Sequence, residues 1–315
     1  MSDAHVKKVD TNNYATQLNN KGIIQLKGEE QVKYLQGQVT ADIELLSDDN
    51  ALLACHCDFK GKVWSVFYAL TWQDSILLVT HQSVLTQSLT ELNKYGVFAK
   101  VDITEESQNW QLIGGRGPAF EASIIELFGK LPQGQQSIIY NDFGVVMSIQ
   151  HPAQRYLVLQ PTNCKSLLKI DVTDDETLWE IDDINAGLAD IRDTTSNEYV
   201  PQMLNLQAVG AINFEKGCYM GQEVVARTKY LGRNKRASFI LTTEAAFADL
   251  SGGSLEYQIG ENWRPGGKIL RSASTNNQTW IFAILPIDTE VSASFRLKSQ
   301  PEITFITQTL PYTIQ

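Results

Sequence analysis

The chain has 315 residues, of which 43% are hydrophobic and 20% charged, and its formal net charge is −10 at pH 7. This composition is typical of a globular protein long enough for two or three domains, and no apolar run approaches the roughly 20 residues that span a bilayer. Four scattered cysteines argue against a disulfide framework, and the acidic balance argues against a surface that binds nucleic acid throughout. The polar start lacks the apolar core of a signal peptide, so we expect a cytoplasmic location.

The first 110 residues mix strands and helices. Strand patterns cover 22–26, 51–58, 63–70, 76–80 and 98–103, and a turn at 59–62 joins two of them in a hairpin. Helical spacing of apolar residues covers 29–37 and 82–95. We therefore expect an α+β domain over residues 1–110.

From residue 111 a similar pattern starts again. A strand at 111–113 leads into an expected glycine turn at Gly114 and Gly115, a short helix covers 120–128, and strands cover 145–149 and 155–159. A mixed segment begins at Trp179 and is followed by a polar stretch rich in turns. We place a second α+β domain at 111–236, and its likeness to the first hints at a duplicated architecture.

Helical patterns disappear after Arg236. Short strand patterns follow at 237–243, 267–272, 280–285 and 292–298, separated by turns rich in Gly, Pro and Asn. Such spacing predicts a small antiparallel β-barrel or sandwich over residues 237–315.

The least ordinary stretch runs from Lys216 to Arg227 and contains Lys-Gly-Cys-Tyr-Met-Gly-Gln-Glu. It opens a basic run, Glu215 to Arg236, within an acidic chain. We expect Cys218 at the start of a helix, where helix termini and nearby cations favour the reactive thiolate form of cysteine. Two interpretations stay open for Cys218, a reactive thiol and a small buried residue. The cations around it suit either a solvated helix face or a site for a carboxylate, a phosphate or an RNA backbone.

Cys55, His56 and Cys57 invite a metal interpretation. On a strand the two cysteines would point one way and the histidine the other, and no second pair of ligands follows at zinc spacing. We therefore expect no metal site.

Two further features have ordinary explanations. The glycines from Gly114 to Gly117 lack the spacing of a dinucleotide-binding loop, so a tight turn is preferred to a phosphate site. Trp179 precedes Asp182 and Asp183 and is either a core residue or a platform for a planar ligand. The sequence has no nucleophile elbow, Walker loop or zinc-protease motif, so by itself it identifies no enzyme.

The stretch Lys216–Glu223 strongly resembles the signature of the YgfZ group, a branch of the family that includes the glycine-cleavage aminomethyltransferase, GcvT. The resemblance spans nearly the whole chain, including 34–42, 56–62, 94–95, 151–152, 201–207 and 311–312. It implies a three-domain ring in which two ferredoxin-like α+β units and a C-terminal antiparallel β-barrel surround a folate pocket.

The resemblance also implies a function. The chain is expected to bind tetrahydrofolate or a derivative and to support iron–sulfur enzymes, including those that thiolate or methylthiolate tRNA. Cys218 is then the key thiol, Trp179 stacks on the pterin, and Lys21 stands where the group has a second tryptophan and could instead meet a folate carboxylate. The residues expected to arrange the loop and the cofactor pocket are Lys216, Tyr219, Gln222, Glu223 and Arg227.

Two alternatives stay open. An aminomethyltransferase would share the fold and the folate, but that branch lacks the Lys-Gly-Cys-Tyr signature and needs a lipoyl protein. A module that contacts tRNA directly through Lys216–Arg236 would have modest, salt-sensitive affinity because the chain is acidic. No membrane partner is expected, and the sequence leaves open whether the protein is itself an enzyme.

Overall fold

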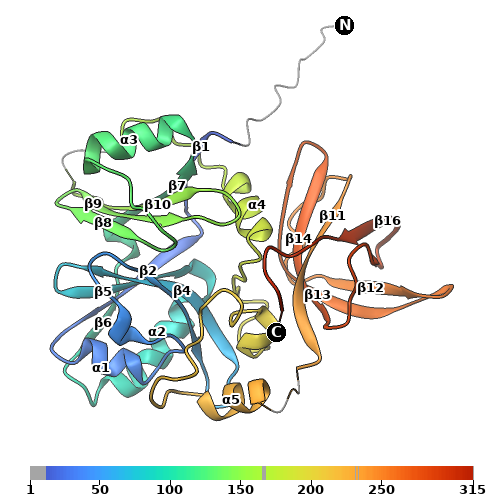
Figure 1. Cartoon of the computed structure of the whole chain (residues 1–315), viewed down its shortest axis with the longest axis horizontal. Coiled ribbons are helices and arrows are strands. Elements are labelled where there is room, and N and C mark those ends of the chain that lie inside the picture. Colours follow the sequence, from blue (N-terminus) through green and yellow to red (C-terminus); the bar gives the residue numbers. More distant parts are fainter. Residues whose placement is uncertain (1–11, 165–167, 231, 233, 315) are drawn as a thin grey trace, which may run out of the picture.

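The computed structural model describes residues 12–164, 168–230, 232 and 234–314. These residues form two five-stranded antiparallel sheets and a closed six-stranded antiparallel barrel (Figure 1). The expected α+β fold with a C-terminal antiparallel barrel is confirmed. Within the described ranges, no helix has the length and apolar character needed to cross a membrane.

The first sheet has the strand order β3-β4-β5-β2-β6. Its strands are β2 (Lys21–Lys27), β3 (Leu52–Cys57), β4 (Val63–Trp72), β5 (Ser75–His81) and β6 (Asp102–Glu105), and its helices are α1 (Gln31–Gln36) and α2 (Gln82–Gly96). The strand expected at 98–103 begins four residues later than expected, at Asp102. Residues after Gly96 form a turn that leaves the Phe98 side chain 87% exposed, so pairing with β2 begins only at Asp102.

The second sheet has the order β1-β7-β10-β9-β8. It consists of β1 (Tyr14–Gln17), β7 (Trp110–Arg116), β8 (Ile138–Asn141), β9 (Gly144–Ile149) and β10 (Arg155–Pro161), with α3 (Pro118–Phe128) on one face. The N-terminal strand β1 pairs with β7, so the chain enters the second sheet before it builds the first.

The glycine turn expected at Gly114 and Gly115 is wrong, because both residues lie inside β7. A Cβ atom on Gly114 would lie 2.4 Å from Cε3 of Trp179, and one on Gly115 would lie 2.5 Å from the carbonyl oxygen of Tyr14. Glycine is therefore needed here for close approach. The chain turns at Gly117, whose φ of +99° suits glycine, and Pro118 begins α3.

The two sheets pack face to face between their helices. Along β4, alternate side chains point to opposite faces. Phe67 and Ala69 join the cluster beneath α2, whereas Leu70 and Trp72 join the cluster shared with the second sheet. The result is a four-layer arrangement with α1 and α2 outside one sheet and α3 outside the other (Figure 1).

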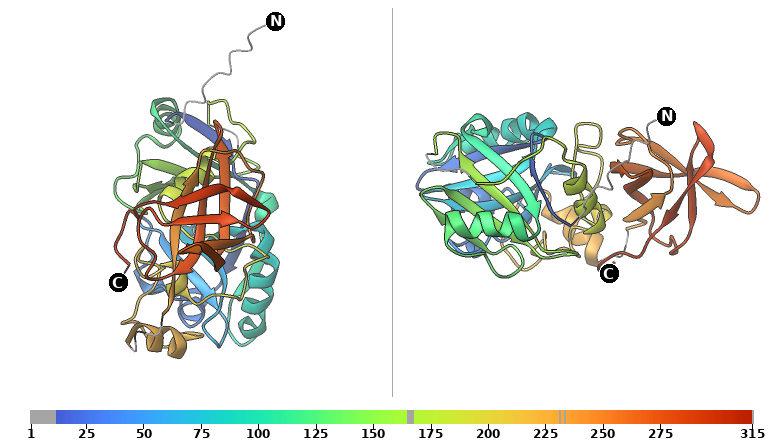
Figure 2. Two further views of the ribbon diagram at one scale, coloured as in Figure 1. Left: turned by 90° about the vertical axis from the view of Figure 1, so that its right-hand side faces the viewer. Right: turned by 90° about the horizontal axis from the view of Figure 1, so that it is seen from above.

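The barrel stands apart from the stacked sheets, and α4 (Thr177–Asn185) lies between them (Figures 1 and 2). Its strands are β11 (Arg236–Thr243), β12 (Ser254–Ile259), β13 (Asn262–Thr275), β14 (Gln278–Pro286), β15 (Ser294–Leu297) and β16 (Gln300–Thr307). The remaining elements are α5 (Gln222–Tyr230) and the short 3-10 helices Ile43–Leu45, Ser107–Asn109 and Pro201–Leu204.

Candidate functional site

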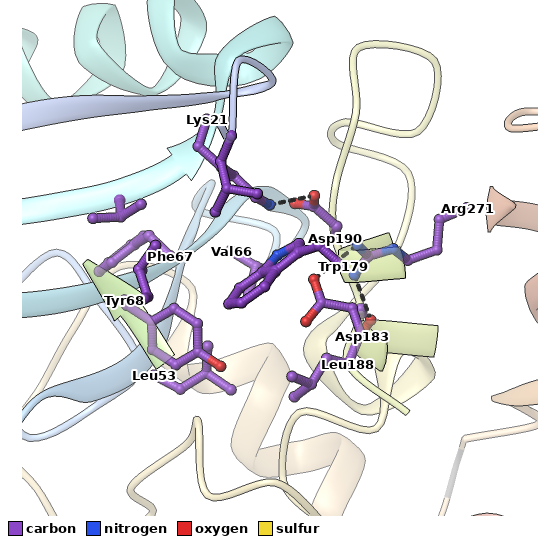
Figure 3. Close-up of a pocket in the computed structure, with 14 residues that line it drawn as sticks. Lys21, Leu53, Val66, Phe67, Tyr68, Trp179, Asp183, Leu188, Asp190 and Arg271 are labelled. Carbon is purple, nitrogen blue, oxygen red and sulfur yellow. Dashed lines mark hydrogen bonds and ion pairs between the residues drawn. The ribbon is translucent and has the colours of Figure 1, made fainter. Parts of the chain in front are cut away.

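A cavity lies where α4 meets the two sheets and the barrel (Figure 3). Trp179 and Asp183 are four residues apart on α4, so both face it from one side of the helix. The enclosed space is about 40 Å³, within a funnel of about 480 Å³ that includes the open solvent at its mouth. The lining residues are Leu18, Lys21, Leu53, Val66, Phe67, Tyr68, Val79, Leu157, Trp179, Asp183, Leu188, Ala189, Asp190 and Arg271.

Lys21 and Trp179, two of the expected cofactor residues, therefore line the same cavity. The Lys21 ammonium lies 2.7 Å from a carboxylate oxygen of Asp190, and both side chains are largely buried. Burial raises the pKa of Asp190, but Lys21, His81 and Arg271 outweigh that effect and hold the pKa below its usual range. The charge of Lys21 is thus already balanced, and a ligand carboxylate would have to compete with Asp190.

A buried ion network fixes α4 to the barrel and to the second sheet. Asp183 lies 2.5 Å from the Arg155 guanidinium and 2.8 Å from that of Arg271, and Arg271 also lies 2.8 Å from Glu180. Arg155 and Arg271 are 0% and 1% exposed. Although burial alone would raise the pKa of Asp183, the two guanidinium groups lower it, so the carboxylate stays ionised.

Two polar groups at the cavity have no hydrogen-bond partner among the described residues, the Tyr68 hydroxyl and the Trp179 indole nitrogen. Burial and the nearby Asp183 raise the pKa of Tyr68, so its phenol stays protonated. Unpaired donors inside an aromatic, apolar cavity suit a planar ligand that carries acceptors, as the pterin ring of folate does. The residues fit such a ring in kind, but 40 Å³ holds only about one water molecule, so side chains must move to admit it.

Leu53 and Leu188 are placed for that movement. Both line the cavity and also a neighbouring cleft of about 250 Å³ whose wall includes Gln135, His151 and Tyr312. They form the boundary between the two spaces.

The signature residues lie elsewhere, on the first-sheet unit beside the β3–β4 hairpin. None of Lys216, Cys218, Tyr219, Gln222, Glu223 and Arg227 lines the cavity. The Met220 amide donates to the carbonyl of Gly37, and the carbonyl oxygen of Asp58 lies 2.5 Å from where a Cβ on Gly221 would be. The structure therefore brings Lys21 and Trp179 together and leaves the signature residues apart from them.

Cys218 is exposed, and its expected place at a helix start is wrong. Gly221 adopts a φ of +81°, which helical residues cannot share, so α5 begins only at Gln222. Because the influence of a helix dipole fades within one turn, Cys218 lies beyond the favourable helix terminus.

Lys216 is only 8% exposed and is turned into the protein. Its ammonium donates to the backbone carbonyls of Gln36, Val39 and Ala41 at 2.7, 2.9 and 2.5 Å. Three acceptors match the three donors of an ammonium group. Burial lowers the pKa of Lys216 to about 8, against the opposing influence of Asp42. Lys216 therefore holds the signature loop against the 36–41 segment.

The remaining signature residues are more ordinary. Tyr219 is buried, and burial together with the nearby Cys55 and Cys57 raises its pKa. The Gln222 amide donates to the Gly217 carbonyl at 3.3 Å, and Glu223 and Arg227 form an exposed ion pair at 4.0 Å. Within the basic run, Leu231 and Arg233 lie outside the described residues.

The cysteines of β3 take the orientation expected of a strand. The sulfur atoms of Cys55 and Cys57 lie 3.7 Å apart, while His56 points to the other face and lies 3.0 Å from the Ser88 hydroxyl. In the part of the chain that the structure describes, no three His, Cys, Asp or Glu side chains are grouped to hold a metal ion.

Sequence reasoning missed most of the polar lining. Tyr68, Asp190 and Arg271 lie on a strand, a loop and a barrel strand that are far apart in the sequence. An arginine within an apolar strand pattern, as at Arg271, is the one signal that could have indicated a buried charge network.

Comparisons with known proteins agree with this architecture. Residues 234–300 match the family model described as "YgfZ, beta-barrel domain". The chain is 37% identical over 294 residues to the tRNA-modifying protein YgfZ of Pectobacterium carotovorum, covering 91% of this chain and 88% of that protein. It is 36% identical over 303 residues to the protein of the same name from Yersinia enterocolitica, covering 94% and 92%.

Among solved structures, the chain resembles the glycine cleavage system aminomethyltransferase T from Bartonella henselae. The TM-score is 0.74 over 96% of this chain and 87% of that one, at 12% sequence identity. This likeness shows the fold, and it confirms the expected GcvT-like architecture.

Proposed function

The chain belongs to the YgfZ family, and from that premise we propose that it is a tetrahydrofolate-binding accessory protein that acts in tRNA modification. It would support the iron–sulfur enzymes that thiolate or methylthiolate tRNA, in the cytoplasm. The observation that carries the folate half is that Lys21 and Trp179 line one cavity with unpaired donors.

The pterin ring would lie against Trp179. The Tyr68 hydroxyl would donate to a ring nitrogen or carbonyl acceptor of the pterin, and Leu53 and Leu188 would move aside to admit it. Lys21 would stay with Asp190 and contribute to the wall.

Tetrahydrofolate titration followed by tryptophan fluorescence tests this part. We expect saturable quenching by the full chain and roughly tenfold weaker binding for Trp179→Phe, because a smaller ring loses stacking area. Trp263→Phe, on a barrel strand away from the cavity, is the matched control. Absence of saturable quenching in the unmodified chain would contradict folate binding.

Cys218 would act on a separate surface. It is exposed on a loop that Lys216 holds in place, next to the hairpin tip that carries the exposed Phe59. We propose that this surface, with the basic residues of α5, meets the iron–sulfur or tRNA-modifying partner and presents the thiol to it.

Complementation tests the role of the thiol. Cys218→Ala should fail to restore thiolated and methylthiolated nucleosides, measured by mass spectrometry of tRNA digests, in a strain that lacks this protein. Cys164→Ala is the control. Full restoration by Cys218→Ala would show that the Cys218 thiol takes no part in the chemistry.

A further inference from the structure

A second cleft lies between the start of α4 and barrel strand β13, on the side of α4 where Glu176 and Glu180 lie. Its volume is about 390 Å³. Its lining carries five carboxylates, from Asp174, Asp175, Glu176, Glu180 and Asp249, and one guanidinium, from Arg192. None of the signature residues and neither Lys21 nor Trp179 belongs to it.

The floor of this cleft holds two incompletely satisfied carboxylates. Glu176 and Glu180 are 8% and 6% exposed. One oxygen of Glu176 accepts from the backbone amide of Asn20 at 2.9 Å, and one oxygen of Glu180 accepts from both Arg192 and Arg271 at 3.0 Å. The other oxygen of each has no hydrogen-bond partner among the described residues. Buried acceptors of this kind are costly to leave unpaired.

The negative charge of the lining is cancelled only in part. Arg192 is shared between Glu180 and Asp249, Arg271 is shared between Glu180 and Asp183, and a helix N-terminus supplies only about half a positive charge against five carboxylates. Burial and the neighbouring Glu180 raise the pKa of Glu176, and the opposing influence of the Asn20 amide and of Lys21 is smaller. The cleft therefore favours a cationic hydrogen-bond donor.

The residues at the rim and the wall of the cleft indicate which kind of cation it would bind. Asp174 and Asp175 are exposed at the rim, and Phe247, Ala248 and Ala273 give the wall an apolar strip. A cleft that combines buried and exposed carboxylates with apolar side chains matches a chain of methylenes with an amine at each end. No three metal-ligand side chains are grouped here among the described residues, which separates this cleft from a metal site.

We propose that this cleft binds an aliphatic diamine or polyamine, with one ammonium at Glu176 and Glu180, the methylenes along Phe247, and a second ammonium at the rim. The carboxylates supply the acceptors that an ammonium needs, and the apolar strip contacts the hydrocarbon. This cleft and the folate cavity share no lining residue.

Isothermal titration of the full chain with spermidine and putrescine, at about 150 mM salt to screen weak surface attraction, tests the proposal. We expect saturable one-to-one binding. Glu176→Gln keeps the acceptor for Asn20 and removes the charge, and it should weaken binding by about tenfold, as expected for a partly buried charge pair. Asp174→Asn should weaken spermidine binding less.

Glu29→Gln is the matched control, since it removes one exposed charge far from the cleft and should leave binding unchanged. Thermal unfolding of each variant checks that it is folded. No saturable heat with either amine overturns the proposal. Equal weakening by Glu29→Gln, or Mg²⁺ binding that is equally strong and equally dependent on Glu176, overturns it in favour of unspecific cation attraction.

Discussion

The guanidinium of Arg155 lies 4.5 Å from the centre of the Trp179 ring, so a buried cation covers one face of the indole. Arg155 is held in turn by Asp183, which sits one helical turn beyond Trp179 on α4. The indole that we propose as the pterin platform is thus fixed before any ligand binds. A preorganised platform loses little conformational entropy on binding.

Gly114→Ala tests whether this fixation matters. The new Cβ would lie 2.4 Å from Cε3 of Trp179 and must displace the indole from β7. We expect a loss of about 2–3 kcal/mol in unfolding free energy and folate binding weakened by at least about tenfold, because overpacking costs that much and the ring is displaced. Urea unfolding and the fluorescence titration measure both.

If Gly114→Ala leaves both the tryptophan emission maximum and the folate affinity unchanged, folate binding does not depend on the position of the Trp179 indole. Gly217→Ala offers the comparison of a glycine with no atom within 4 Å of its added methyl group and with no positive φ.

Lys216→Met should destabilise the protein by about 3 kcal/mol, because three buried carbonyl groups lose their donor while the methylene stem is kept. Chemical denaturation measures the change, and Lys235→Met, at an exposed lysine, is the control. Arginine should not restore the stability, since its planar group cannot reproduce an ammonium that meets three carbonyls. A stability equal to that of the unmodified chain would show that Lys216 does not hold the loop.

Two glycines, Gly217 and Gly221, lie on either side of Cys218, and only the second should matter. Gly221→Ala places a methyl group 2.5 Å from the Asp58 carbonyl at a positive φ, and we expect a loss of about 2–3 kcal/mol together with loss of complementation. Gly217→Ala meets no atom within 4 Å and should be nearly neutral. Equal effects of the two substitutions would refute the assignment of Gly221 as the fixed turn of the loop.

His56 should make the fold sensitive to acid. Burial lowers its pKa to about 4, against about 6.5 in an unfolded chain. Between these values the unfolded chain binds a proton that the folded chain does not, so stability falls as the pH drops from 6.5 to 4. The full effect is about 3 kcal/mol.

Replacing His56 with Gln should lessen the dependence of unfolding free energy on pH within that window, as measured by urea titrations at several pH values. His81, whose pKa burial also lowers to about 4, should account for part of the slope that remains. The same replacement at the exposed His151 is the comparison. An unchanged slope in His56→Gln would assign the acid sensitivity to other groups.

The strands and helices with clear periodicity could be predicted from the sequence, and α2 is a good example because Leu85 and Leu92 repeat at helical spacing beside polar residues. Gly114 could not be assigned correctly, since the need for glycine comes from Trp179, 65 positions further along. Local propensity reports on neighbours in sequence, and close approach of distant segments lies outside it.

The residues of the candidate site could likewise be predicted only in part. Lys21 and Trp179 were identified as cofactor residues through resemblance, and they do line one cavity. The inward turn of Lys216 was not foreseen, because a lysine in a basic run is usually solvated and nothing local marks the carbonyls of residues 36–41 as its acceptors. Arg271 was missed although its place within an apolar strand pattern could have indicated a buried charge.

The ion pairs that α4 makes with the barrel have a consequence for how the protein unfolds. Glu180 and Asp183 on this helix are neutralised in part by Arg271, which the barrel contributes. A shortened chain that ends before the barrel would keep two buried carboxylates and lose their common cation. Heat or denaturant should therefore unfold the sheets and the barrel in one cooperative transition. Removal of the barrel should destabilise the sheets, so the barrel is not an independent module.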